Sequence, residues 1–150
     1  MKKKILIGAF IAAVPLVGLL LVARTLYPTN VAETAPEHED AALRTRRYRV
    51  DLKTFAAEAE RIVPTLSTWG ANWRRAATEI DESSARIRAE VPVVFFTDDL
   101  EIRAEKDAAG DSVVVNVRSN SRVGKSDFGE NRRHVVKILG ALDSRFGEGN

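Results

Sequence analysis

The sequence predicts an α+β domain that follows an N-terminal transmembrane helix. Residues 5–23 form a run of nineteen residues without a charge. Much of the later chain alternates apolar and polar residues with the period of β-strands, and two segments, 51–66 and 128–146, carry apolar residues at helical spacing. We therefore expect a small antiparallel sheet of three to five strands with two helices packed on one face.

The first element, residues 1–24, is expected to be a membrane anchor. As a helix, residues 5–23 would span roughly 28 Å, about the hydrocarbon thickness of a bilayer. The alternative is a cleaved signal peptide, but its apolar region would be shorter and would end in small residues, where this chain has Leu21. The lysines at positions 2–4 place the N-terminus in the cytoplasm by the positive-inside rule. We expect a single-pass protein of the inner membrane whose C-terminal domain is periplasmic or otherwise extracytoplasmic.

Composition divides the rest of the chain into a linker, a domain and a tail. Residues 25–43 are rich in proline, threonine and acidic residues, which predicts a flexible linker. The α+β domain is expected over residues 44–147 and the tail over 148–150. After residue 24 the remaining 126 residues carry 19 basic and 21 acidic side chains, formally −2. That balance predicts no nucleic-acid partner.

The elements of the domain are expected in the order strand, helix, strands, helix. A short strand is predicted at Tyr48–Val50, and Asp51 is placed to cap a helix that Pro64 kinks or ends near Val63. Further strands are predicted over 73–80, 85–91, 100–105 and 113–117, with a hairpin loop at 107–111. The last helix is expected to begin at about Phe128.

The alternation predicts a sheet with one apolar and one charged face. The apolar residues that would meet the helices are Ile87, Ala89, Val91, Leu100, Ile102, Val113, Val115 and Val117. The residues expected on the other face are Arg86, Arg88, Glu90, Glu101, Arg103, Glu105, Asn116 and Arg118. Such a charged face is usually solvated, although an open sheet face is also a surface for a partner or a lipid headgroup.

The segment from Arg118 to Arg133 holds the strongest sequence motif, an Arg-Ser-x-Ser-Arg-x-Gly-x-x-Asp-x-Gly-x-Asn run. This run resembles the signature of a bacterial and plastid family known as domain of unknown function 1499. Phe96-Thr97-Asp98-Asp99 and Arg103 resemble the family's aromatic–Asp-Asp–Arg segment. The resemblance covers roughly residues 45–146. It implies a small domain, often with a signal or membrane segment, and it assigns no activity, so the matching residues carry over only as a family signature.

Two interpretations of this segment stay open. In one, amides at the start of the last helix and nearby basic side chains bind an anion such as a phosphate or a lipid headgroup. In the other, the segment connects a strand to a helix, with Asp127 and Glu130 spaced as a capping box. The candidate anion- or partner-binding residues are Arg118, Ser119, Ser121, Arg122, Gly124, Lys125, Asp127, Gly129 and Asn131.

Catalytic, metal and cofactor chemistry has little support in the sequence. The chain has no cysteine and no Gly-x-Ser-x-Gly motif. His38 and His134 are too far apart in sequence to suggest a metal set, and Asp98-Asp99 is interpreted as a pair of turn and edge residues. We therefore predict no catalytic residue, metal or cofactor.

Two pairs of aromatic residues can each be interpreted either as packing residues or as membrane-interface residues. Trp69 and Trp73 flank Gly70 after the first helix, where they would pack a corner of the fold or lie at a membrane interface. The same alternatives apply to Phe95-Phe96.

Together these features predict a membrane-anchored, non-catalytic binding module that acts as an accessory or scaffold subunit of a membrane protein complex. The expected partners are the bilayer, through residues 5–23, and an integral membrane protein. The alternative is a lipid- or anion-binding envelope protein that uses the Arg122–Asn131 loop. An enzyme of unknown class is the third hypothesis.

Overall fold

The computed structural model describes Val22, residues 29–124 and residues 126–147. The longer elements are α2 (Leu52–Ile62), β5 (Arg74–Ile80), β6 (Ser84–Val93), β7 (Phe96–Lys106), β8 (Val113–Ser121) and α3 (Glu130–Phe146). The shorter ones are β1 (Val31–Glu33), η1 (Ala41–Leu43), β2 (Arg46–Tyr48), η2 (Val63–Thr65), β3 (Ser67–Thr68) and β4 (Ala71–Asn72).

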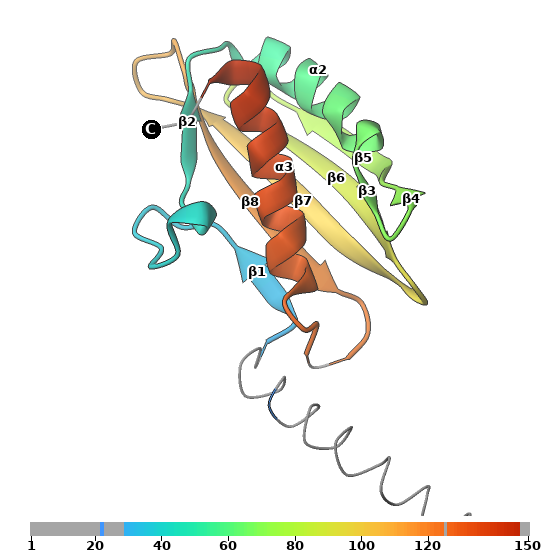
Figure 1. Ribbon diagram of the computed structural model, residues 1–150. Coiled ribbons are helices and arrows are strands. Elements are labelled where there is room, and N and C mark those ends of the chain that lie inside the picture. Colours follow the sequence, from blue (N-terminus) through green and yellow to red (C-terminus); the bar gives the residue numbers. More distant parts are fainter. Residues whose placement is uncertain (1–21, 23–28, 125, 148–150) are drawn as a thin grey trace, which may run out of the picture.

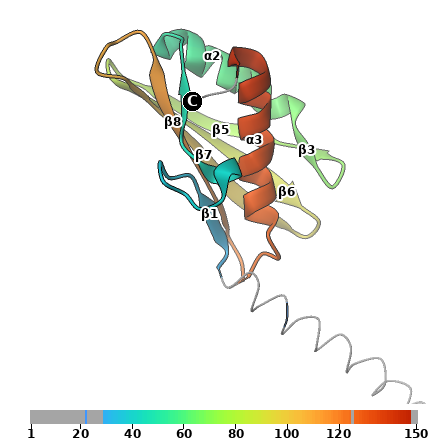
Figure 2. The same ribbon diagram turned by 60° about the vertical axis from the view of Figure 1, so that its left-hand side comes forward.

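The main sheet is antiparallel, with the order β1-β8-β7-β6-β5, and β2 also pairs with β8. Both helices lie on one face of this sheet and leave its other face open (Figures 1 and 2). The predicted α+β fold, with an antiparallel sheet and two helices, is therefore confirmed. The sheet has six strands rather than three to five, because β1 and β2 follow one another along the same edge of β8.

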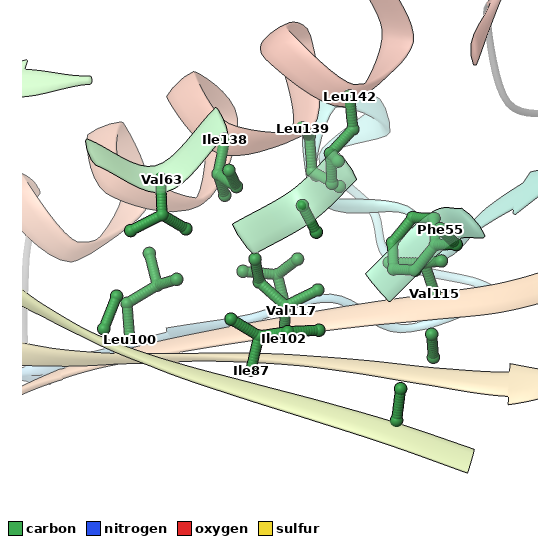
Figure 3. Close-up of a cluster of buried hydrophobic side chains, with 14 of the residues drawn as sticks. Phe55, Val63, Ile87, Leu100, Ile102, Val115, Val117, Ile138, Leu139 and Leu142 are labelled. Carbon is green, nitrogen blue, oxygen red and sulfur yellow. The ribbon is translucent and has the colours of Figure 1, made fainter. Parts of the chain in front are cut away.

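The core fills the space between the helices and the sheet. The eight residues predicted for the apolar sheet face are each at most 2% exposed. Phe55 of α2 and Ile138, Leu139 and Leu142 of α3 meet them from above, as Figure 3 shows. Alternation along the strands and helical spacing along α2 and α3 thus place the apolar side chains in one layer.

Local signals explain where the helices begin and end. Asp51 Oδ1 accepts a hydrogen bond from the Thr54 amide at 3.0 Å, which caps α2 as predicted. The α-helix ends at Ile62 and passes into η2, which contains Pro64. The last helix begins at Glu130 rather than at about Phe128, because Phe128 and Gly129 have positive φ angles of 55° and 81°. A right-handed helix excludes that backbone conformation.

The first predicted strand is displaced along the chain. It was expected at Tyr48–Val50 and lies at Arg46–Tyr48, where it pairs with Val113–Val115 of β8. Val50 instead lies in the turn that leads to the cap of α2.

The prediction of a flexible linker over residues 25–43 is wrong for residues 29–43. β1 pairs with β8, Thr34 Oγ1 accepts a hydrogen bond from the Val117 amide at 2.9 Å, and Leu43 is only 5% exposed. A short edge strand needs partners for its backbone groups rather than an apolar sequence, so composition misses it.

The predicted anchor at residues 1–24 lies, apart from Val22, outside the described residues, and so does the tail at 148–150. Within the described residues, no helix has both the length and the apolar character needed to cross a membrane.

Candidate binding site at the apolar end of the domain

Three of the predicted site residues form a buried hydrogen-bond network. Ser119 Oγ donates to Asn131 Oδ1 at 2.6 Å, and Asn131 Nδ2 donates to Ser121 Oγ and to the Asn30 carbonyl, both at 2.8 Å. Ser119 and Asn131 are fully buried. Leaving one such group without a partner costs about 1–3 kcal/mol. These side chains therefore join the end of β8, the first turn of α3 and the chain before β1.

The two arginines of the motif lie on the open face of the sheet. Arg122 Nη2 donates to Asp99 Oδ1 at 2.6 Å and to Glu90 Oε1 at 2.8 Å, and these two carboxylates raise the pKa of Arg122. Arg118 lies 3.6 Å from a carboxylate oxygen of Glu33. Both guanidinium groups thus have carboxylate partners within the domain.

In the loop between β8 and α3, a carboxylate of the protein itself binds the amides at the start of the helix. The Asp127 carboxylate accepts hydrogen bonds from the amides of Gly129 and Asn131, at 2.9 and 2.8 Å. Asp127 therefore occupies the position in which an external phosphate would bind the helix N-terminus. The predicted capping box is not formed, because the helix starts after Gly129 and the Asp127 carboxylate accepts from the Gly129 and Asn131 amides rather than from that of Glu130. The Glu130 carboxylate lies 2.8 Å from Arg133 Nη2 instead of reaching back.

Glycines shape the same loop. Gly124 and Gly129 both have positive φ angles, 93° and 81°, which glycine adopts without the steric cost of a Cβ. The Gly124 carbonyl accepts a hydrogen bond from Asn30 Nδ2 at 2.8 Å. Lys125 lies outside the described residues.

Beneath this loop lies a buried pair that the sequence interpretation missed. Asp98 and His134 are 3% and 1% exposed, and His134 Nδ1 lies 3.7 Å from Asp98 Oδ2 and 3.4 Å from Ser119 Oγ. Burial raises the pKa of Asp98 and lowers that of His134 to about 4. Because burial disfavours the imidazolium, His134 is neutral near pH 7 and does not form an ion pair with Asp98.

The position of Asp98 was predictable in principle. It was interpreted as a turn and edge residue, yet it lies inside β7 and shares the inward side with Leu100 and Ile102. The alternation that placed those two residues in the core places Asp98 there as well. Similarly, His134 lies one turn before Ile138 on the buried face of α3.

Above the buried pair, a pocket of about 430 Å³ opens at this end of the domain. The polar residues in its lining are Asp98, Ser121, Ser126, Asp127, Glu130 and Arg133. Its apolar lining includes six large side chains that are exposed to solvent, namely Trp69, Val94, Phe95, Phe96, Val123 and Phe128. We call these six residues the apolar rim.

A second hollow, of about 560 Å³, lies on the open face of the sheet and is lined mainly by polar side chains, including Arg88, Arg103 and Arg118. The charges of this face pair with one another: Arg103 with Glu101 of the same strand, and, across neighbouring strands, Arg88 with Glu79 and Arg86 with Glu101 at 3.6 Å. The predicted charged face is thus present, and its charges largely satisfy one another.

One serine–histidine contact and the metal-ligating side chains of the described residues bear on the chemistry that the site could perform. The Ser119 hydroxyl next to His134 is fully buried, so a substrate has no access to it. No group of three or more His, Cys, Asp or Glu side chains in the described part of the chain is placed to hold a metal ion.

The fold and the site together define a small α+β domain with an apolar pocket at one end, in which the polar motif residues build the loop and the floor. The chain belongs to the family of proteins of unknown function DUF1499, whose family model matches residues 23–142. This match confirms the family suggested by the Arg118–Asn131 motif, and it extends upstream to include β1. None of the curated proteins compared with the chain matches it.

Proposed function

We propose that this protein is a membrane-anchored, non-catalytic binding module that serves as an accessory or scaffold subunit of a membrane protein complex. The observation that carries the proposal is where the described chain enters the domain. Asn30 is hydrogen-bonded to Gly124 in the loop that lines the apolar pocket. Ala23, the last residue of the uncharged run in the predicted anchor, is seven residues earlier, at most about 25 Å of extended chain. The anchor would therefore hold the apolar end of the domain near the bilayer.

Tethering explains how such a module would work without chemistry. A domain confined to the membrane surface meets a membrane partner at a high effective concentration, so even a weak contact is occupied. The helices cover one face of the sheet, and the other presents alternating arginine and glutamate side chains. We infer that this open face contacts the partner subunit, in the extracytoplasmic compartment that the positive-inside rule assigns to the domain.

A lipid-binding envelope protein is the second candidate. The pocket favours it, because its volume of about 430 Å³ lies in the range of small-ligand sites and its rim is apolar. An anionic headgroup at the α3 N-terminus is disfavoured, because Asp127 already holds the amides of Gly129 and Asn131. This candidate therefore requires an apolar rather than an anionic point of recognition.

The test is gentle purification of the full-length protein from its native membrane, with mass spectrometry of the proteins and lipids that accompany it. We expect a stoichiometric membrane protein partner. The double variant Arg103→Glu/Arg118→Glu, at the centre of the open face, should lose that partner. The matched control, Lys53→Glu on the exposed side of α2, should keep it. Protein that purifies alone, or only with a defined lipid, would overturn the accessory-subunit proposal.

A further inference from the structure

We propose that the apolar rim inserts into the interfacial layer of the bilayer, so that the anchor and the rim together fix the orientation of the domain on the membrane. This inference rests on the proposed function only in that the anchor must bring the domain to the membrane. The occupant that we assign to the pocket mouth is the bilayer surface itself.

The first support is the exposure of the rim. Phe95 is 87% and Trp69 68% exposed, and the rim holds six of the eight large hydrophobic side chains that are exposed within the described residues. Scattered single apolar residues are ordinary on a protein surface, but a contiguous patch marks an interaction surface. Ile80, which is exposed but not part of the rim, is the last residue of β5. It lies beside the β5–β6 turn, at the end of β6 opposite to the β6–β7 hairpin.

The second support is that three separate chain segments converge on this one surface. Trp69 comes from the β3–β4 hairpin, Val94, Phe95 and Phe96 from the β6–β7 hairpin, and the remaining two from the β8–α3 loop. Tryptophan and other aromatic side chains at loop tips suit the membrane interface, where an apolar ring lies beside polar headgroups.

The third support is backbone strain at the rim. Trp69 and Phe128 have φ angles of 50° and 55°, and they are the two non-glycine residues with positive φ in the described part of the chain. This conformation is disfavoured for large side chains, and strained residues cluster where function requires a particular side-chain direction. Here both strained residues carry aromatic rings that remain exposed in water.

The fourth support is the place where the described chain begins. Val31 pairs with Asn120 and Asp98 pairs with Ser121, so β1 starts at the end of the sheet that carries the β6–β7 hairpin and the β8–α3 loop. Figures 1 and 2 show the beginning of β1 and the beginning of α3 at this same end. A membrane segment that precedes β1 would therefore bring the bilayer to the rim.

The charges at the pocket are compatible with this position. The Glu130 carboxylate is paired with Arg133, and the Asp127 carboxylate is held by backbone amides. Asp98 lies at the floor and is only 3% exposed. The surface that would meet the bilayer is thus dominated by the apolar rim, which predicts binding to zwitterionic lipid without a requirement for anionic lipid.

The experiment uses full-length protein reconstituted in phosphatidylcholine vesicles, with part of the lipid brominated near the headgroup end of its acyl chains. Bromine quenches tryptophan only at short range, and the chain has two tryptophans. Because Trp69 is exposed on the rim and Trp73 is 1% exposed, we expect wild-type emission to fall by roughly a third, as for one interfacial tryptophan of the two. Brominated lipid should leave the tryptophan emission of the Trp69→Phe variant almost unchanged.

A positional control uses Ile80→Trp in the Trp69→Phe background, which puts an exposed tryptophan at the far end of the sheet. It should not be quenched. If wild-type emission is not quenched while the protein resists carbonate extraction, bilayer insertion is overturned and the anchor is retained. If carbonate extracts the protein, it is not anchored in the membrane, and the proposed function is overturned before insertion of the rim can be judged.

A second measurement replaces Phe95 with the photo-crosslinker p-benzoylphenylalanine in native membranes. Crosslinks to lipid support insertion of the rim, whereas a crosslink to a single protein would show that a protein partner covers it and would overturn the bilayer assignment. Because Phe95 is 87% exposed, the substitution leaves the core intact.

Discussion

His134 and Asp98 place two titratable groups in the interior of the domain, with pKa shifts in opposite directions. Burial lowers the pKa of His134 to about 4 and raises that of Asp98. His134 Nε2 lies 3.7 Å from Glu130 Oε2 and has no hydrogen-bond partner. The folded state therefore prefers a neutral imidazole, which links folding to proton binding.

The linkage predicts a loss of stability in mild acid. Between the ordinary pKa of 6.5 and the folded value of about 4, the unfolded chain binds a proton that folded His134 does not, so stability falls as the pH falls. From pH 7 to pH 5 this single group should cost about 2 kcal/mol. Asp98 acts in the opposite sense, because its folded carboxyl holds a proton more tightly than the unfolded one. Its contribution to stability is lost as the pH rises through the raised pKa.

Urea unfolding of the full-length protein at pH 7 and pH 5, followed by tryptophan emission, tests this linkage. His134→Gln should flatten the pH dependence and Asp98→Asn should steepen it. An unchanged dependence in His134→Gln would show that other groups dominate.

Single residues of the motif were predicted to gather at one loop, but their roles depend on partners that the sequence does not reveal. Asn131 is buried because it bonds to Ser119, Ser121 and the distant Asn30 carbonyl. Arg122 was a candidate anion- or partner-binding residue, and it pairs with Asp99 and Glu90 on neighbouring strands. Such pairings follow from strand register, which a single sequence does not define.

At the scale of elements, periodicity predicted most of the fold. Alternation located β6, β7 and β8, and helical spacing located α2 and α3, because burial on one face imposes these periods. The elements that it missed are short: β1 and the β3–β4 hairpin have three or two residues per strand. Too few residues alternate there for a period to be visible.

The hydrogen bonds of Asp127 at the start of α3 lead to a prediction about this helix. Asp127→Ala should cost about 1 kcal/mol, because two amides at the start of α3 lose their acceptor. Hydrogen exchange at Asn131 should become roughly fivefold faster, the ratio that 1 kcal/mol represents. The matched variant Asp51→Ala should do the same at Thr54 of α2 and leave Asn131 unchanged. Unaltered exchange at Asn131 in Asp127→Ala would contradict the assigned cap.

On the scale of the whole molecule, the sequence does not predict that the residues of the apolar rim form one surface. Trp69 and Phe95-Phe96 were each considered for a membrane interface, but Val123 and Phe128 belong to a loop interpreted through its polar residues. Only tertiary structure brings the three segments to one pocket. The same holds for Asn30, which connects the beginning of the described chain to that pocket.

The boundary of the folded unit supplies the last prediction. A chain that begins at residue 44, the boundary that composition suggests, lacks β1, Thr34 and the buried Leu43. It leaves the Val117 amide and carbonyl without the partners that Thr34 provides at 2.9 Å, and it uncovers one edge of β8. The combined loss of buried groups is about 5 kcal/mol, a large part of the stability of a small domain.

Thermal unfolding followed by circular dichroism should therefore show a cooperative transition for a chain that begins at residue 29. The chain that begins at residue 44 should melt at a much lower temperature or aggregate through the exposed strand edge. Equal melting temperatures would mean that β1 and η1 contribute little to the stability of the domain. A clear difference would mean that the residues joining the predicted anchor to the sheet are part of the folded unit, so that a force or a reorientation at the membrane reaches β8 and the apolar rim directly.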